Sequence, residues 1–247
     1  MAETFIQGNF KFEVIDEKKK SVRIMRKDIN TDFNGKLIIP SSVTENGKKY
    51  TVIEIGGFVG EEQLYDKVED KRSRTGYRME KGRCVKRYGF GSTQITEVVI
   101  PETIETISTD CFLNCSKLAK VIIPKNVKKL ESSAFSGTAL KTIVIPGSIS
   151  IIPRFGFSSC NQLEKVEIEQ GVTKIEEYAF QDTHIKKISL PSSVDIVEKN
   201  AFFICHEIKE AVIDDSDGTI SLEKGAFPSS CKILYKSQMG FLGKLFH

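Results

Sequence analysis

The sequence contains no tryptophan, only three histidines and no apolar run long enough to span a bilayer. A transmembrane helix needs about 20 consecutive apolar residues, so we expect no membrane insertion. The opening residues MAETFIQGNF carry neither the basic segment nor the apolar stretch of a signal peptide. No signal peptide is visible, which leaves two interpretations open: an intracellular chain, or an exported one in which Met1 and Ala2 replace a removed signal.

Sequence motifs of the common enzyme classes are also missing. The chain has no G-x-S-x-G, no phosphate-binding P-loop, no G-x-G-x-x-G and no H-E-x-x-H motif, which carry nucleophilic, nucleotide-dependent and zinc-dependent chemistry in other proteins. The turn that contains Asp214, Asp215 and Asp217 lacks the later glutamate of an EF-hand, which favours a solvated turn over a calcium site. We therefore predict a non-enzymatic protein that needs no cofactor and no metal.

Positive charge is concentrated in one segment. The net charge is +3, but residues 71–88 contain eight basic residues and one acid, which leaves the rest of the chain at −4. Tyr77 and Tyr88 are interleaved with the basic residues, a composition suited to contacts with phosphate or acidic glycans. The alternative interpretation is a solvated insertion whose charges keep it soluble. The candidate polyanion-binding residues are Lys71, Arg72, Arg74, Arg78, Lys81, Arg83, Lys86 and Arg87.

Phenylalanine recurs at an almost fixed interval along most of the chain. The ladder phenylalanines are Phe90, Phe112, Phe135, Phe157, Phe180, Phe202 and Phe227, spaced by 22 or 23 residues except for a last step of 25. Six of the seven directly follow alanine or glycine, which indicates a crowded turn. A period of about 20–50 residues is typical of repeat architectures such as a solenoid, in which each coil buries its apolar face against its neighbours. Each ladder phenylalanine should therefore fill the space between adjacent coils.

Two short apolar patterns precede the phenylalanine in each repeat. The first, as in Val121-x-Ile123, alternates like a half-buried strand and usually ends at a proline, which cannot donate to a sheet ladder. The second is a pair three residues apart, such as Val127 and Leu130. Its spacing fits a strand or a helical turn, and its many β-branched residues favour a strand. We therefore predict coils of 22 or 23 residues with parallel strands and short turns.

Cys115, Cys160 and Cys205 stand three residues after a ladder phenylalanine in alternate coils, and threonine takes this place in the coils between them. Cysteines two coils apart should be separated by about 9.6 Å, whereas a disulfide needs Cα atoms within about 7 Å. We therefore expect buried thiols that alternate with threonine. His184 and His206 lie in adjacent coils near Cys205, but no fourth zinc ligand is evident, so a metal site is the less favoured interpretation.

The repeats resemble the leucine-rich repeats of the BspA type, also called the treponemal type. Segments such as EVVIPETIETISTDCFLNCSKL and KVIIPKNVKKLESSAFSGTAL are similar to that family's repeat, in which a strand ending in proline is followed by a small residue, phenylalanine, cysteine and leucine. The resemblance covers residues 96–208 closely, and 37–95 and 209–235 more loosely. It implies a β-rich leucine-rich-repeat solenoid that is capped at both ends.

The ends and one internal stretch depart from the repeat. We expect an N-terminal β-hairpin cap in residues 1–36, about eight coils in residues 37–235 and a C-terminal cap or tail in residues 236–247. A basic insertion near 61–83 interrupts the coils. After it, Val85 and Phe90 stand in the repeat register, so we assign them to a second coil whose strand, around 76–79, is degenerate.

The same resemblance implies a surface protein, as in Bacteroidetes-like bacteria, that attaches to host or matrix proteins. We expect a partner protein to bind the outward-facing side chains of the strands, because a solenoid exposes an extended regular face. Polyanion binding through residues 71–88 and an intracellular scaffold remain alternatives, and the oligomeric state is open. The candidate protein-binding residues are Glu97, Val99, Lys120, Ile122, Thr142, Val144, Lys165, Glu167, Lys187 and Ser189, and Val212 continues their outer column.

Overall fold

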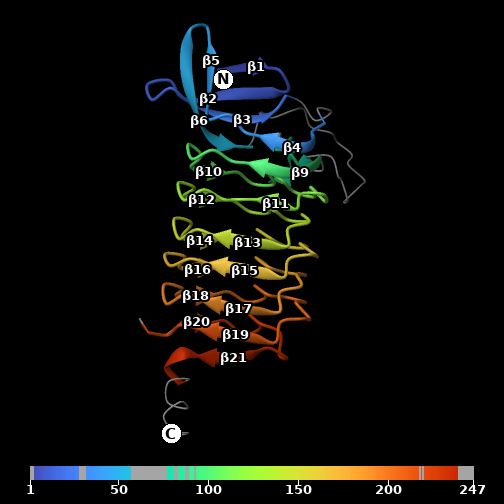
Figure 1. Cartoon of the computed structure of the whole chain (residues 1–247), viewed down its shortest axis with the longest axis vertical. Coiled ribbons are helices and arrows are strands. Elements are labelled where there is room, and N and C mark those ends of the chain that lie inside the picture. Colours follow the sequence, from blue (N-terminus) through green and yellow to red (C-terminus); the bar gives the residue numbers. More distant parts are fainter. Residues whose placement is uncertain are drawn as a thin grey trace.

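The computed structural model describes residues 3–27, 32–56, 77–80, 83–86, 89–91, 93–216, 218 and 220–238, and at 77–80 and 83–86 it describes the backbone alone. Strands and turns make up nearly all of this part of the chain. The coils stack into an elongated solenoid, with the first strands at one tip and the last strand at the other (Figure 1). The predicted β-rich repeat solenoid is therefore confirmed.

One strand of each coil lies in a stack that we call the front strands. They are β4 (Asn34–Ile38), β9 (Gln94–Val99), β11 (Lys120–Val121), β13 (Thr142–Ile145), β15 (Lys165–Ile168), β17 (Lys187–Leu190), β19 (Glu210–Ile213) and β21 (Lys232–Tyr235). The hydrogen-bonded pairs among them are parallel, and from β9 onward the partner residues lie about one repeat apart, as Ile143 and Val166 do. Period-2 alternation turns every second side chain into the core.

A second stack, the side strands, runs along the adjoining face of the solenoid. It contains β6 (Lys48–Ile55), β10 (Thr106–Ile107), β12 (Lys129–Leu130), β14 (Ile151–Ile152), β16 (Lys174–Ile175), β18 (Ile196–Val197) and β20 (Ser221–Leu222). The predicted second strand is confirmed, but from β10 onward it is two residues long and holds only the second member of each apolar pair. The first member, for example Val127, lies in the preceding turn, where its amide donates to the Pro124 carbonyl at 3.1 Å.

Three antiparallel strands cover the N-terminal end of the stack. β1 (Thr4–Gln7), β2 (Phe10–Asp16) and β3 (Ser21–Arg26) pair in that order, and β3 then pairs with β6 in parallel. β5 (Ser42–Glu45) folds back on β6 across Asn46 and Gly47, which both have positive φ as a type I′ hairpin turn requires. Phe12, Val22 and Ile24 are buried against the first coil, so these strands close that end of the core.

The prediction of a separate second coil around residues 76–90 is wrong. β4 pairs directly with β9, and β6 pairs directly with β10, so no coil stands between them. Phe90 instead completes the coil that β4 and β6 begin. β7 (Tyr77–Glu80) and β8 (Arg83–Lys86) pair with each other as an antiparallel hairpin. The repeat register at Phe90 was correctly recognised, but the register does not show how many residues of the coil precede its phenylalanine.

The ladder phenylalanines form the centre of the core. Adjacent rings stack with centroids 4.5–5.9 Å apart, and all except the terminal Phe227 are fully buried. The small residue before each ring is a spatial requirement, because a Cβ on Gly89 would lie 2.9 Å from the Cα of Cys111. Both predictions about this ladder, the filling of the inter-coil space and the crowded turn, are confirmed.

The predicted alternation of buried cysteine and threonine is also confirmed. Cys160 Sγ donates to the Phe135 carbonyl at 3.1 Å and lies 3.2 Å from Thr138 Oγ1, which donates to the same carbonyl at 2.9 Å. The same triad recurs around Cys115 and Cys205. These cysteines form no disulfide with another described cysteine, and their contacts join one coil to the next.

Candidate protein-binding site

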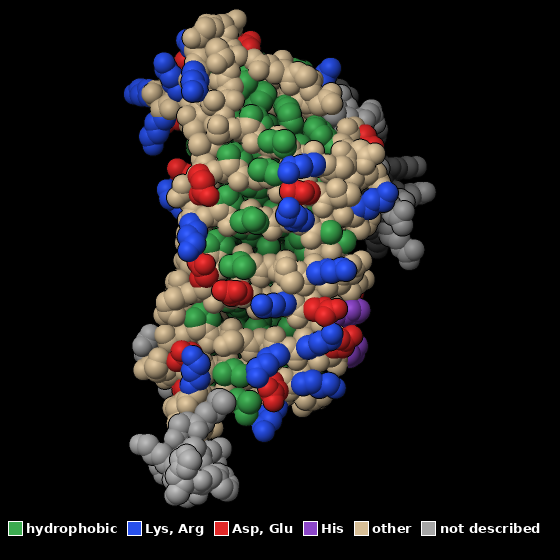
Figure 2. Space-filling view, in the orientation of Figure 1, with side chains coloured by type: hydrophobic (Ala, Val, Ile, Leu, Met, Phe, Trp, Pro, Cys, Tyr) green, Lys and Arg blue, Asp and Glu red, His purple; other side chains and the backbone are tan. Residues whose placement is uncertain are grey.

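Four apolar side chains are exposed side by side on the front strands. This apolar strip consists of Ile38, Val99, Ile122 and Val144, whose exposed fractions are 61%, 37%, 74% and 45%. Each follows an inward-facing residue in the alternation of its strand, and Ile38 is paired with Val99 in the β4–β9 register. Hydrophobic side chains gather on the upper part of the front face, whereas charged side chains cover its lower part (Figure 2).

The strip overlaps the predicted outer column but does not coincide with it. Glu167 and Ser189 continue the column and are exposed, yet both are polar, so the apolar part ends after Val144. Val212 was expected on this outer column but is only 9% exposed, because β19 lies between β17 and β21 and Leu234 faces Val212 in the register. Ile38 was missed, although KLIIP at residues 36–40 matches KVIIP at 120–124 and could have revealed it.

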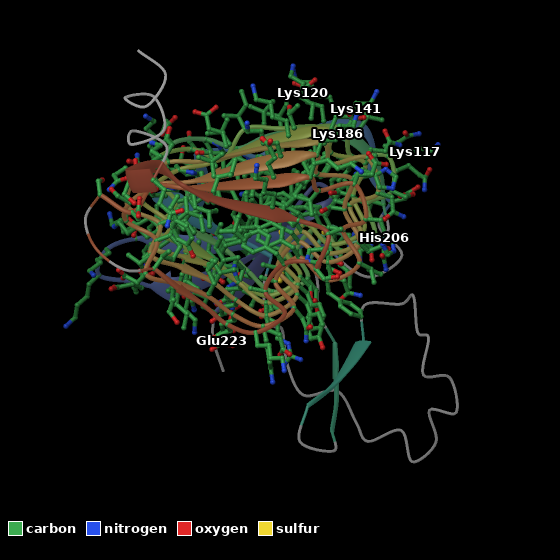
Figure 3. The ribbon with its side chains drawn as sticks, turned by 90° about the horizontal axis from the view of Figure 1, so that it is seen from below. Lys117, Lys120, Lys141, Lys186, His206 and Glu223 are labelled. Carbon is green, nitrogen blue, oxygen red and sulfur yellow. The ribbon has the colours of Figure 1, made fainter. Side chains whose placement is uncertain are left out.

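Lysines line the edge of the same face. The lysine row consists of Lys36, Lys120, Lys141, Lys165, Lys186, Lys187, Lys209 and Lys232, which occupy the two positions before the first inward residue of the front strands. Only three acids, Glu97, Glu164 and Glu210, share these positions, so the row carries a net charge of +5. Lys120, Lys141 and Lys186 project from the same side of the ribbon (Figure 3).

Ion pairs neutralise part of the lysine row. Glu97 lies 3.1 Å from Lys120 Nζ and 3.2 Å from Lys36 Nζ, and the hydrogen bonds from these two lysines lower the pKa of its carboxyl. Lys186 pairs with Glu164 at 2.9 Å, and Lys187 pairs with Glu210 at 2.8 Å. Lys141, Lys165, Lys209 and Lys232 take part in none of the ion pairs formed by the described residues. The face is therefore apolar in its centre and cationic along one edge.

The candidate polyanion site lies outside the residues whose side chains the structure describes. Lys71, Arg72, Arg74, Lys81 and Arg87 are not described, and Arg78, Arg83 and Lys86 are described only as backbone of β7 and β8. No geometry can be assigned to this group of side chains, so polyanion binding through residues 71–88 stays a prediction.

The residues considered for metal binding differ in their exposure to solvent. Cys205 Sγ is buried and donates to the Phe180 carbonyl at 2.9 Å, whereas His184 is half-exposed, with Nδ1 4.0 Å from Glu207 Oε1, and His206 is exposed. Within the described part of the chain, no group of three or more His, Cys, Asp or Glu side chains could hold a metal ion. The same part contains no helix long and apolar enough to cross a membrane.

Known proteins share the repeat and its coiled arrangement. Residues 84–209, just over half of the chain, match the family described as BspA type leucine rich repeat region in six copies. The structure of the pneumococcal vaccine antigen PcpA is similar over 87% of this chain and 51% of that one, with 21% identity and a TM-score of 0.65.

A second similar structure is that of a leucine rich cell surface protein from Faecalibacterium prausnitzii. The similarity covers 88% of this chain and 55% of that protein's chain, with 22% identity and a TM-score of 0.58. The chain thus spans about half the length of these two proteins, and a likeness at such identities shows the fold. No curated protein matches the sequence.

Proposed function

The chain belongs to the BspA-type leucine-rich repeat family, and we propose that it is a non-enzymatic module that attaches to a partner protein through its front strands. The family match suggests a protein-interaction or adhesion module in general terms. The apolar strip supplies the more specific argument, because four exposed aliphatic side chains occupy one column on neighbouring front strands.

Contiguity makes the strip a better candidate than single exposed residues elsewhere. Isolated apolar side chains are normal on protein surfaces, but contiguous apolar patches with a polar border mark interaction sites. Three steps of about 4.8 Å give the strip a length of about 14 Å, which corresponds to roughly ten residues of a helix. The strip alone is thus the size of an interface centre rather than of a whole interface.

The lysine row predicts the chemistry of the partner. A partner surface with an apolar patch and a border of carboxylates would cover the strip and meet the lysines at the same time. Complementary charges at an interface border contribute mainly to the rate of encounter and to orientation. We accordingly propose a protein partner whose binding surface is acidic at its edge, and, by analogy with the described cell surface protein, a host or matrix protein met outside the cell.

A binding screen with substituted chains tests this proposal. The purified chain is measured against a panel of immobilised extracellular matrix proteins, beside a variant that carries both Ile122→Ser and Val144→Ser. The matched control is Ile151→Ser, because Ile151 is 42% exposed on β14 among the side strands. We expect the double variant to bind the partner at least about tenfold more weakly, as the loss of about 1.4 kcal/mol would cause.

The control separates the front strands from general surface effects. Ile151→Ser should bind like the unchanged chain, and equal losses in both variants would contradict a site on the front strands. Binding that a sulfated glycan abolishes while the double variant retains it would favour the polyanion alternative instead.

A further inference from the structure

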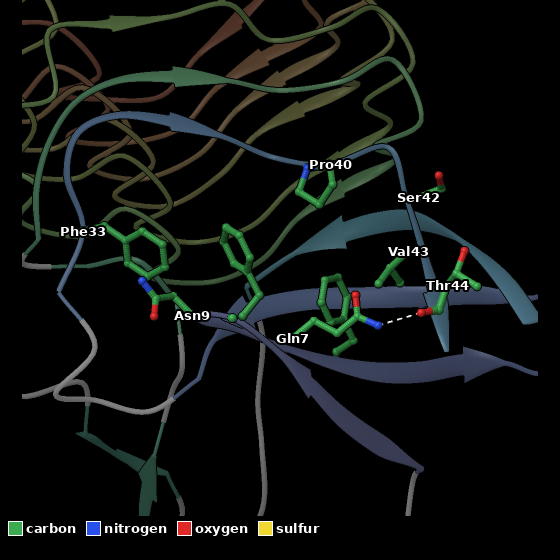
Figure 4. A pocket seen from close by; sticks show the side chains of 10 residues that line it. Gln7, Asn9, Phe33, Pro40, Ser42, Val43 and Thr44 are labelled. Carbon is green, nitrogen blue, oxygen red and sulfur yellow. Dashed lines mark hydrogen bonds between the residues drawn. The ribbon is translucent and has the colours of Figure 1, made fainter. Parts of the chain in front are cut away.

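A cavity lies under the N-terminal strands, next to the end of the apolar strip. Its volume is about 540 Å³, and it is bounded by the β1–β2 turn on one side and by the segment from Phe33 to Thr44 on the other (Figure 4). The Gln7 side chain donates to the Thr44 carbonyl at 2.6 Å and thereby joins the two sides. This volume falls within the range of about 300–1,000 Å³ that is usual for ligand sites.

Three aromatic rings contribute to the walls of this cavity, and its described lining residues carry no charge. Phe10 lies 5.4 Å from Phe33 and 6.3 Å from Phe12 between ring centroids, and Val43 completes the apolar lining. None of the described residues that line the cavity is a Lys, Arg, Asp or Glu. A charged ligand would lose its hydration here without gaining an ion pair, which is costly. An additional aromatic ring would gain burial together with favourable edge or offset contacts to these rings.

Four of the ten described lining residues, Gln7, Asn9, Ser42 and Thr44, carry uncharged polar side chains. Asn9 and Ser42 each supply one uncharged side chain, and both belong to the β1–β2 turn or the start of β5. Among the described residues neither side chain has a hydrogen-bond partner. They suit the amide groups of a peptide backbone, which needs both a donor and an acceptor.

The cavity and the apolar strip belong to one continuous surface. Ile38 is exposed, Ile39 is buried and Pro40 lines the cavity, so the alternation of an extended segment turns Ile38 and Pro40 to the same side. A partner protein that lies on the strip would therefore also reach the cavity, which lies at the end of the strip nearest the N-terminal strands. Anchor side chains that fill such pockets often dominate the energy of a protein interface.

We propose that this cavity binds an aromatic side chain of the partner protein, as the anchor of the interface centred on the apolar strip. The inference rests on the proposed function, because it assumes that a protein lies on the front strands. The lack of charge among the described lining residues, the aromatic rings in the walls and the continuity with Ile38 favour an aromatic residue over a carboxylate, a phosphate or a cationic side chain.

Capped amino acids test the cavity without knowledge of the partner. N-acetylphenylalaninamide is titrated into the full chain while the amide resonances of Gly8, the Gln7 side chain and Ser42 are followed. We expect saturable shifts with a dissociation constant of about 1 mM, the affinity of a contact worth about 4 kcal/mol. N-acetylglutamic acid amide and methyl glucoside should cause no saturable shift at these positions.

Two variants locate the binding. Ser42→Phe fills the cavity and Phe33→Ala removes a wall, and each should weaken the binding of N-acetylphenylalaninamide at least about fivefold, provided that its melting curve shows a folded chain. The strip variant Ile122→Ser should leave this binding unchanged.

The outcomes separate this inference from the proposed function. Absence of saturable shifts, equal shifts with the glucoside or with octanoate, or unchanged binding in both folded cavity variants would overturn the anchor site. If the cavity variants bind the partner protein as well as the unchanged chain while Ile122→Ser with Val144→Ser does not, the anchor fails and the front-strand function stands. If neither set of variants weakens partner binding, the proposed function itself fails.

Discussion

Residues with a left-handed backbone conformation flank the ladder phenylalanines on both sides. From Phe112 to Phe202, the residues two before and two after each ring have positive φ, for example Ser133 at 56° and Asp182 at 56°. Asparagine, aspartate and glycine tolerate this conformation, whereas β-branched and bulky residues are strained in it. Phe155, Tyr178 and Ile204 occupy such positions nonetheless, with φ of 56°, 60° and 51°. Stacking between Phe155 and Tyr178 at 5.2 Å offsets the strain for the two aromatic residues.

Ile204 has no comparable stacking and is 37% exposed, which leads to the first prediction. Ile204→Asn should raise the free energy of unfolding by about 0.5–1 kcal/mol, because asparagine adopts the left-handed conformation at lower cost. Denaturant unfolding of the full chain measures the change. The control Ile151→Asn, at an exposed strand position with ordinary φ, should bring no gain. An equal or lower stability of Ile204→Asn would show that the strain is negligible.

The buried thiols give the second prediction. Burial raises the pKa of Cys111, Cys160 and Cys205 above the ordinary value, and the thiolate is the reactive form. In the folded chain these residues should resist alkylation that labels them completely after unfolding, as peptide mapping by mass spectrometry can measure. Labelling of Cys160 in the native chain at the rate of a free thiol would contradict the triad of Cys160, Thr138 and the Phe135 carbonyl.

The same pKa shifts predict that the folded chain loses stability at alkaline pH. Because the folded chain holds these thiol protons more tightly than the unfolded chain, their contribution to stability is complete below the unfolded pKa of about 8.5. It falls as the pH rises from there through the raised folded values. The chain should therefore lose stability above about pH 8.5, and Cys160→Ser should reduce this loss.

At the scale of the elements, carboxylates connect successive coils beside the side strands. In four coils, the glutamate that follows the side strand accepts a hydrogen bond from a backbone amide of the preceding coil at 2.9 Å. The pairs, with the glutamate first, are Glu131 and Thr109, Glu176 and Arg154, Glu198 and Glu177, and Glu223 and Lys199. Burial of the Glu131 carboxyl acts to raise its pKa, but hydrogen bonds from Lys129 and from Thr109 outweigh this and lower it. Pro153 takes this position in one coil, so the series is interrupted there.

Glu131→Ala should therefore destabilise the chain by about 1.5–3 kcal/mol at neutral pH, the usual value of a hydrogen bond to a charged group. The depressed pKa means that this contribution is present above the unfolded pKa of about 4.3 and is lost as the pH falls below it. Denaturant unfolding at about pH 7 and about pH 3.5 measures both effects.

Glu164→Ala is the control, because the Glu164–Lys186 pair is exposed on both sides, at 57% and 60%. Exposed pairs contribute little to stability because water and salt screen them, so this variant should hardly change the free energy of unfolding. A Glu131 variant that equals it at neutral pH would show that the inter-coil hydrogen bond adds nothing to stability.

Because the coils stack on one another, loss of a ladder phenylalanine should destabilise the chain more in the middle of the stack than at its end. Phe135→Ala and Phe157→Ala remove rings that stack on both sides, at 5.3 and 5.7 Å and at 5.7 and 5.5 Å, and should cost about 3–5 kcal/mol. Among the described residues, Phe227 stacks on Phe202 alone, and it is partly buried, so Phe227→Ala should cost clearly less. Thermal unfolding measures the order, and equal losses at Phe135 and Phe227 would count against a core built by stacking neighbours.

At the scale of the whole molecule, most of the repeating features could be predicted from the sequence, whereas the length of the first coil and the cavity beside it could not. Val121 and Ile123 predicted a front strand because alternation is a local signal that recurs in each coil. The assignment of Phe90 to a separate second coil failed because the repeat register does not show how many inserted residues precede it. Ile38, at the end of the apolar strip, could have been recognised from KLIIP at residues 36–40. The cavity could not, because it arises where the β1–β2 turn meets the first coil.

Charge is distributed unevenly over the molecule, and this leads to the last prediction. The lysine row carries +5 and residues 71–88 carry +7, which leaves the remainder of the chain at −9. A partner with an acidic border should therefore be drawn to the front face from solution, and salt should screen this attraction over a distance of about 10 Å.

Removal of Lys141 and Lys165, which form none of the ion pairs among the described residues, should slow association without faster dissociation, because charges at an interface border act mainly on the encounter. We expect the association rate of Lys141→Ser with Lys165→Ser to fall about twofold to fivefold at low salt and to converge with that of the unchanged chain at high salt. The matched control is Lys18→Ser with Lys19→Ser, which removes the same charge from the exposed β2–β3 turn. If both double variants slow association equally, net charge alone draws the partner, and the lysine row does not orient it on the front strands.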